Sequence, residues 1–294
     1  MVTVAVIAPG AMGSAVAGRL IQSGCSVLTI LEGRSDETRK RAKEVGMVDA
    51  SITAIAEQAD LVLSIIPPRD AYSFAKKFAD ALATVSRFNK EVVFADCNAV
   101  NPNTVKKIAT LFDNISAGFV DGCIIGGPPT SDGYNPTFYI SGDHQAGLDS
   151  FGGLEKYGLK IKVLSGEGVG TGDASALKMS YAGISKGITG LFTTMILAAH
   201  SSSSATSEAL LHELRASQPA LLERITRTVP PMLPKAYRWV GEMQEIAAFV
   251  GNGEGEIYEG IAKTYERIER GLQDDSNGDV KALKDFVNLA RKQL

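Results

Sequence analysis

The first residues whose types and spacing suit chemistry are Ala8-Pro9-Gly10-Ala11-Met12-Gly13, between an apolar run and a helix-forming sequence. This order predicts a strand, a tight turn and a helix N-terminus. Gly10 would let the backbone approach a diphosphate, Gly13 would let the helix lie close to the strand, and the helix N–H groups would face the anion. The segment departs from the dinucleotide-binding pattern G-x-G-x-x-G at Ala8. We predict cofactor contacts from Gly10, Ala11, Met12 and Gly13, with a plain strand-to-helix turn as the alternative.

A second group of candidate ligands follows the apolar run 27–31. An acidic residue at this place typically binds the ribose hydroxyls of NAD, whereas the 2′-phosphate of NADP needs cationic and hydroxyl donors. Arg34 and Ser35 are such donors, so we predict NADP, with NAD less favoured. The Glu32 carboxylate either faces the ribose or points away while Arg34 binds the phosphate. A solvated surface charge is the alternative for Arg34.

The elements that would position these groups alternate between buried strands and helices. Further strands are predicted at 61–66, 91–96, 119–125, 137–143 and 160–164, with helical spacing at 69–85 and from about residue 103. This alternation predicts an α/β Rossmann domain with a doubly wound parallel sheet over residues 1–165. Ligands bind at the carboxyl ends of such strands, where Pro67 and Asn98 follow two of them. We predict both as cofactor contacts, with an Asx-turn as the alternative for Asn98.

After a glycine-rich run at 166–172 no strand pattern recurs, which predicts an all-α domain over residues 166–294. The stretch 173–200 is one long helical pattern with apolar residues on more than one side, so we expect a central helix and a homodimer formed through this domain. We expect no membrane-spanning segment, because Lys178, Ser180, Ser185 and Lys186 interrupt the stretch. The serine run 201–204, the prolines Pro230, Pro231 and Pro234 and the glycine-rich segment 251–255 are expected to interrupt the helices.

Composition restricts the class of partner. The 294 residues carry a formal net charge of −3, which disfavours nucleic acid and a membrane surface and favours a small-molecule substrate. The three cysteines are widely spaced in or beside apolar runs, as expected for buried thiols in a reducing compartment. Met1 runs directly into the first strand, so we expect no signal peptide and a cytoplasmic protein. The three histidines are isolated in sequence, and we predict no metal site.

Several segments, in order, resemble the β-hydroxyacid dehydrogenase and 6-phosphogluconate dehydrogenase superfamily, which includes imine reductases. The resemblance spans about residues 2–190. It rests on the glycine turn at 8–13, the cofactor-selecting triplet at 33–35, the segments 96–102 and 121–127, and the segment 170–182. It implies a Rossmann domain followed by a helical domain of the 6-phosphogluconate dehydrogenase type, and an active site closed by a partner chain.

The resemblance also implies the residues of an active site. The last segment places the catalytic lysine at Lys178, as the general acid/base, and Tyr181 lies three residues further on. Tyr181 could donate the proton instead or orient the lysine, with core packing of its ring as the alternative.

The substrate loop of the family falls on 121–127, so Ile125, Gly126 and Gly127 are expected to line the substrate together with Asn98. Ile125 replaces the family's serine, and Ala182 replaces its asparagine. Both changes make the pocket less polar than one built for a small hydroxy acid.

These observations favour an NADP-dependent oxidoreductase that transfers hydride between the cofactor and a small hydroxy or keto acid or related carbonyl compound. Two alternatives stay open. One is an imine reductase, which acts on C=N, and the other is a catalytically silent NADP-binding sensor.

Overall fold

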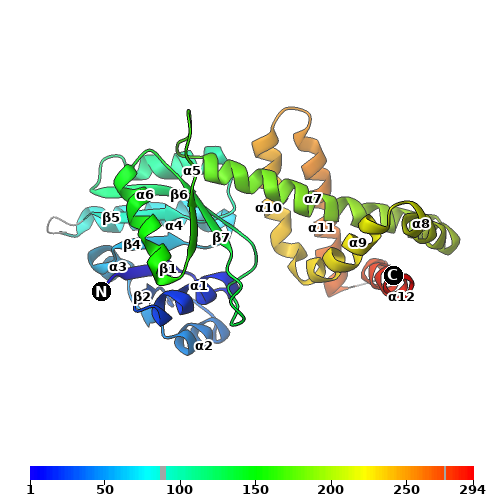
Figure 1. Ribbon diagram of the computed structural model, residues 1–294, viewed down its shortest axis with the longest axis horizontal. Coiled ribbons are helices and arrows are strands. Elements are labelled where there is room, and N and C mark those ends of the chain that lie inside the picture. Colours follow the sequence, from blue (N-terminus) through cyan, green and yellow to red (C-terminus); the bar gives the residue numbers. More distant parts are fainter. Residues whose placement is uncertain (87–90, 275) are drawn as a thin grey trace. The chain divides into compact units, whose positions relative to one another are not determined.

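The computed structural model describes residues 1–86, 91–274 and 276–294, which form two compact units, residues 1–179 and 180–294. The first unit contains, in its described part, one sheet with the strand order β3-β2-β1-β4-β5-β6-β7-β8 (Figure 1). The strands are β1 (Thr3–Ile7), β2 (Ser26–Thr29), β3 (Val48–Asp49), β4 (Leu61–Ser64), β5 (Val92–Asp96), β6 (Ala117–Ile125), β7 (Thr137–Ser141) and β8 (Lys160–Val163). The helices between them are α1 (Ala11–Gln22), α2 (Asp36–Val45), α3 (Ile52–Gln58), α4 (Pro68–Thr84), α5 (Pro102–Ala109) and α6 (Gln145–Gly152).

The predicted Rossmann fold is confirmed, with two differences in the sheet. Strand β7 runs antiparallel to β6, because the segment 126–136 between them contains no helix that could carry a parallel crossover. Strand β3 was not predicted, since it has only two residues and both are exposed. The predicted domain boundary near residue 165 lies before the division of the two units at residues 179 and 180.

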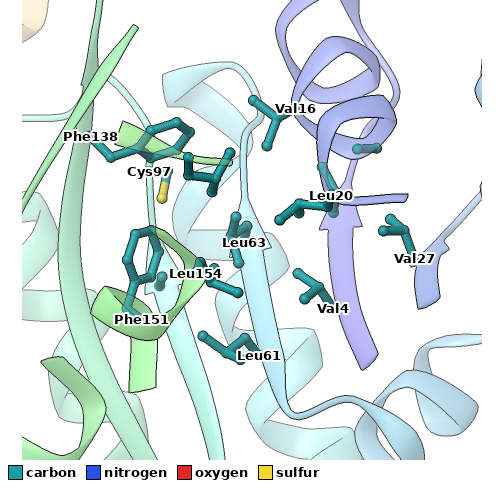
Figure 2. Packing of buried hydrophobic residues seen from close by; sticks show 14 of the residues in the cluster. Val4, Val16, Leu20, Val27, Leu61, Leu63, Cys97, Phe138, Phe151 and Leu154 are labelled. Carbon is teal, nitrogen blue, oxygen red and sulfur yellow. The ribbon is translucent and has the colours of Figure 1, made fainter. Parts of the chain in front are cut away.

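Both faces of the sheet are buried, as a doubly wound sheet requires. Val4 and Val6 belong to the hydrophobic cluster on one face, while Ala5 and Ile7 belong to the cluster on the other. Figure 2 shows the first cluster, in which Val16 and Leu20 of α1 point toward strand residues such as Val4 and Leu63. The alternation of strand side chains therefore fixes α1 against β1, directly behind the glycine turn.

The second unit is helical. Helix α7 (Asp173–Ser202) begins in the first unit and continues into the second, which also contains α8 (Ser204–Ser217), α9 (Pro219–Met232), α10 (Ala236–Val250), α11 (Gly255–Gln273) and α12 (Asp279–Gln293). The serine run separates α7 from α8 as predicted. The expected interruption by prolines falls at Pro234, in the 3₁₀ turn Leu233–Lys235 between α9 and α10, whereas α9 continues through Pro230 and Pro231 to Met232. Pro230 cannot donate to the Thr226 carbonyl, and the Arg291 guanidinium donates to it instead, at 3.1 Å.

Within the described part of the chain, α7 is long and apolar enough to cross a membrane by length and composition. The four polar residues expected to interrupt this stretch are spread too thinly to bring its average hydropathy below this limit. The core helix of a soluble protein meets the same limit, and 44% of the most apolar window of α7 is buried within the chain.

Candidate cofactor and substrate site

The turn after β1 has the backbone geometry that its sequence predicts. Ala8 has a φ of +66°, a left-handed conformation that costs a residue with a Cβ about 1 kcal/mol. This is the position at which the dinucleotide pattern has its first glycine. A Cβ at Gly13 would lie 2.3 Å from the Ala8 carbonyl oxygen, so only glycine allows α1 to lie this close to the turn.

The N-terminus of α1 has room for an anionic ligand. A Cβ at Gly10 would meet no atom within 4 Å. Among the described residues no side chain caps α1, and its first turn holds no acidic residue. The first N–H groups of a helix have no partner within the helix and carry its positive dipole end. The Gly10 N–H already donates to the Ala8 carbonyl at 2.8 Å. The features fit the diphosphate of a dinucleotide, to which the N–H groups of residues 11–13 would donate while Gly10 allows its close approach.

Arg34 and Ser35 lie where the second strand leads into α2. Arg34 is exposed, and its guanidinium has no hydrogen bond or ion pair with the described residues. Ser35 is the N-cap of α2, and its Oγ accepts a hydrogen bond from the Thr38 N–H at 3.4 Å. Glu32 is also exposed. Both donors of the predicted 2′-phosphate site are therefore on the surface at this strand end.

Arg41 is a further cation at this place that the sequence analysis missed. Its Nη1 donates to the Pro9 carbonyl at 3.1 Å, and its Nη2 pairs with Glu37 at 2.7 Å. It thus ties α2 to the glycine turn. The signal in the sequence is an arginine two helical turns after Arg34.

Asn98 holds two strand ends together. Its Oδ1 accepts from the Ile66 N–H at 2.7 Å, and its Nδ2 donates to Ser64 Oγ and Asp96 Oδ2, both at 3.0 Å. Both amide N–H groups are thus engaged in a side chain that is only 3% exposed, and direct contact with a ligand stays a prediction. Pro67 lies between β4 and α4, where it is exposed and is the N-cap of α4.

The predicted substrate loop, 121–127, comprises the end of β6 and the two glycines that follow it. Gly126 has a φ of +130°, and a Cβ there would lie 2.3 Å from the Tyr134 hydroxyl. The Gly127 N–H donates to that hydroxyl at 3.1 Å. Tyr134, which the sequence analysis did not select, therefore fixes the two glycines beside Ile125.

The structure brings Lys178 to this same strand end. Lys178 lies in the second turn of α7, and its Nζ donates to the Ile124 carbonyl at 2.6 Å. The two segments that the family resemblance joins, 121–127 and 170–182, are thus in contact within the first unit. Burial raises the pKa of the Cys123 thiol to about 12, and the nearby Lys178 ammonium opposes this rise.

Tyr181 lies three residues after Lys178 along α7, in the second unit, and is 52% exposed. The alternative given for Tyr181, packing of its ring in the core, is therefore wrong for this chain. Ala182, which replaces the asparagine of the family pattern, is buried. A catalytic role for Tyr181 stays a prediction.

These features define the class of the first unit, a Rossmann domain of the dinucleotide-binding type. A family model described as the NAD binding domain of 6-phosphogluconate dehydrogenase matches residues 3–164, more than half of the chain. The chain belongs to this family. A second model, described as a domain of unknown function, matches residues 202–268.

Curated relatives match along part of their length. The chain is 27% identical over 134 residues to the mitochondrial 3-hydroxyisobutyrate dehydrogenase of Rattus norvegicus, covering 45% of this chain and 39% of the relative. It is 30% identical over 154 residues to an uncharacterized 28.5 kDa protein of Methanothermus fervidus, covering 52% and 53%. The chain thus spans about half, or less, of the length of the curated relatives it matches.

Solved structures match over nearly the whole chain. A conserved protein of unknown function, described as structurally similar to 3-hydroxyacid dehydrogenases, has a TM-score of 0.64 at 25% identity and covers 92% of this chain and 98% of its own. The imine reductase of Myxococcus stipitatus in complex with NADP⁺ has a TM-score of 0.55 at 16% identity and covers 97% and 99%. At that identity the second match shows the fold alone.

Proposed function

We propose that the protein is an NADP-dependent oxidoreductase that transfers hydride between NADP(H) and a small hydroxy or keto acid or a related carbonyl compound. The observation that carries the proposal is the contact of Lys178 Nζ with the Ile124 carbonyl, 2.6 Å. This contact brings an amine to the substrate loop in the same unit as the open glycine turn.

Each group of residues has a distinct task. The N–H groups of residues 11–13 bind the diphosphate, which Gly10 allows to come close, and Arg34 with Ser35 binds the 2′-phosphate. When bound, the nicotinamide supplies or accepts the hydride. Lys178 Nζ gives a proton to the substrate oxygen, or takes it, while the Ile124 carbonyl holds the amine in place. Ile125 supplies an apolar wall.

An imine reductase is the second candidate. Ile125 and Ala182 remove two polar side chains from the family pattern, and the exposed hydroxyl of Tyr181 offers another proton donor. The loss of these polar side chains would suit a C=N substrate that lacks a carboxylate.

Turnover against two substrate panels tests the proposal. NADPH oxidation is followed with β-keto acids and aldehyde acids in one panel and with cyclic imines in the other. We expect turnover in the first panel. Turnover confined to imines would select the second candidate, and NADPH binding without turnover in either panel would identify a catalytically silent sensor.

We further infer that the protein is a homodimer formed through its helical unit. Tyr181, Ile184, Leu191 and Met195 of α7 are each 52–63% exposed and recur at the spacing of one helix face. Leu191 and Met195 also line an apolar groove of about 520 Å³ between α7, α8 and α9. A second copy of the chain, with the same face, would cover both. Light scattering at micromolar concentration is expected to give twice the mass of one chain, and a monomer with full activity would contradict this.

A cytoplasmic location is part of the same proposal. Cys25, Cys97 and Cys123 are all buried and carry free thiols, which suits a reducing compartment.

A further inference from the structure

A carboxylate that the sequence analysis did not select lies beneath the start of α7. Asp121 of β6 is fully buried. Its Oδ2 accepts hydrogen bonds from the Gly172 N–H and the Ser175 N–H, both at 3.0 Å. It also accepts from Ser141 Oγ at 3.1 Å, while Oδ1 accepts from Ser175 Oγ at 2.7 Å. Four donors, from β7, from α7 and from the residue just before α7, thus converge on one carboxylate.

The first turn of α7 is fixed to the sheet by this network. Ser141 Oγ, which donates to Asp121, also accepts from the Ala174 N–H at 2.9 Å. Asp121 and Ser141 are register partners on β6 and β7. Side chains of two strands therefore satisfy three N–H groups that a helix start leaves open, so the start of α7 has little freedom to move on the sheet.

Lys178 closes a second contact between the same two elements. Ser175 binds Asp121, and one helical turn later Lys178 binds the carbonyl of Ile124, three residues further along β6. The two contacts run side by side along one strand and one helix. A shift of the first turn would therefore carry Lys178 Nζ away from the substrate loop.

The charges of Asp121 and Lys178 also affect the pKa of one shared neighbour, the Cys123 thiol. The Cys123 thiol lies near both, since the Lys178 ammonium lowers the pKa of this thiol and the Asp121 carboxylate raises it. Burial raises the pKa of Asp121, and the four hydrogen bonds oppose this rise because they stabilise the charged form. A negative charge beside an ammonium group favours its protonated state.

We propose that Asp121 is the positioning residue of Lys178, which fixes the first turn of α7 on β6 and holds a negative charge near the lysine ammonium. The inference deepens the proposed function and rests on it only for what Lys178 does in turnover. The contacts themselves do not depend on the reaction.

Competitive acetylation tests the proposal without a substrate. The full chain is labelled with acetic anhydride at a series of pH values, and peptide mass spectrometry gives the pKa and intrinsic reactivity of each lysine. In Asp121→Asn we expect the pKa of Lys178 to fall by about one unit. This variant loses the charge and also alters the four hydrogen bonds of Asp121, whereas Ser175→Ala keeps the charge and removes one hydrogen bond.

Asp143→Asn is the matched control. Asp143 lies at the same junction and accepts from the Thr171 N–H at 3.3 Å, but it is exposed and does not join β6 to α7. It loses the same charge, and we expect the titration of Lys178 to match the parent.

Ser175→Ala is a second variant that tests the proposal even if Asp121→Asn does not fold. It removes only the hydroxyl that binds Asp121 Oδ1, which loosens the first turn, and we expect the neutral amine of Lys178 to react several-fold faster. An unchanged titration and reactivity of Lys178 in the folded variants would overturn the proposal. If the variants behave as expected while Lys178→Met keeps full turnover, the positioning holds and the catalytic role of Lys178 fails.

Discussion

Two helix starts of this protein use the same backbone chemistry in opposite ways. At the start of α1 the chain is glycine-rich, no side chain of the described residues caps the helix, and a Cβ at Gly10 would point into open space. At the start of α7 the side chains of Asp121 and Ser141 take the N–H groups of Gly172, Ala174 and Ser175. Every helix start leaves N–H groups without partners. An open start can bind an anion, whereas a filled start fixes what the helix carries.

The largest expected effect separates the tasks of the two helices. Lys178→Met, in α7, should lower kcat by about 100-fold or more, because a positioned acid or base contributes on that scale. The affinity for NADPH should stay within a few-fold, because we expect the phosphates to bind at the start of α1. Steady-state kinetics and a cofactor titration give the two values.

Tyr181→Phe is the control, since it keeps the ring and removes the hydroxyl. If Tyr181→Phe abolishes turnover and Lys178→Met does not, Tyr181 is the proton donor. This result would favour the imine reductase as the function of the protein. If neither changes kcat, the two residues do not belong to the reacting site.

The next effect concerns the fold around the open start. Gly13→Ala places a Cβ 2.3 Å from the Ala8 carbonyl oxygen, and the shift this forces should lower the free energy of unfolding by about 1–3 kcal/mol. Urea unfolding measures it. Gly10→Ala is the matched control, with a φ of −69° and no neighbour within 4 Å. Equal loss of stability in both variants would contradict the geometry of the turn.

Features that depend on neighbouring residues could be predicted from the sequence, whereas contacts between residues far apart in the chain could not. The predicted strands and the glycine turn follow local patterns, and the structure has them at or near the predicted residues. Asp121 meets Gly172 and Ser175 across 51 and 54 residues, and no periodicity connects such partners. From the sequence alone, Asp121 is therefore only one residue of the segment 121–127 that resembles the family.

Other differences have equally specific causes. The reversal of β7 depends on a connection without a helix, which strand patterns do not report. Pro230 remains inside α9 because Arg291, 65 residues away, binds the freed carbonyl of Thr226. Local rules predict the break correctly for an isolated helix and fail where a distant side chain replaces the lost donor.

A smaller effect tests cofactor choice at Arg34, just before α2. Arg34→Ala should erase a preference of about tenfold for NADPH over NADH, equivalent to about 1.4 kcal/mol. The affinity for NADH should hardly change, since NADH lacks the 2′-phosphate. Calorimetric titration of both cofactors checks this, and equal affinities in the parent protein would contradict the predicted NADP site.

The smallest effect concerns Ala8. Ala8→Gly relieves the left-handed conformation at φ +66° but increases the entropy of the unfolded chain. The balance should stabilise the protein by about 0.5 kcal/mol. A lower midpoint of urea unfolding than in the parent would show that the turn does not strain Ala8.

The comparison of the two helix starts is tested most directly by titrating NADPH into three proteins, the parent, Gly10→Ala and Asp121→Asn, by calorimetry. We predict that the parent binds NADPH, that Gly10→Ala weakens binding by at least about tenfold because its methyl group occupies the approach to the diphosphate, and that Asp121→Asn stays within a few-fold of the parent. No binding by the parent, or an equal loss in both variants, would contradict the assignment of the open start to the cofactor and of the filled start to Lys178.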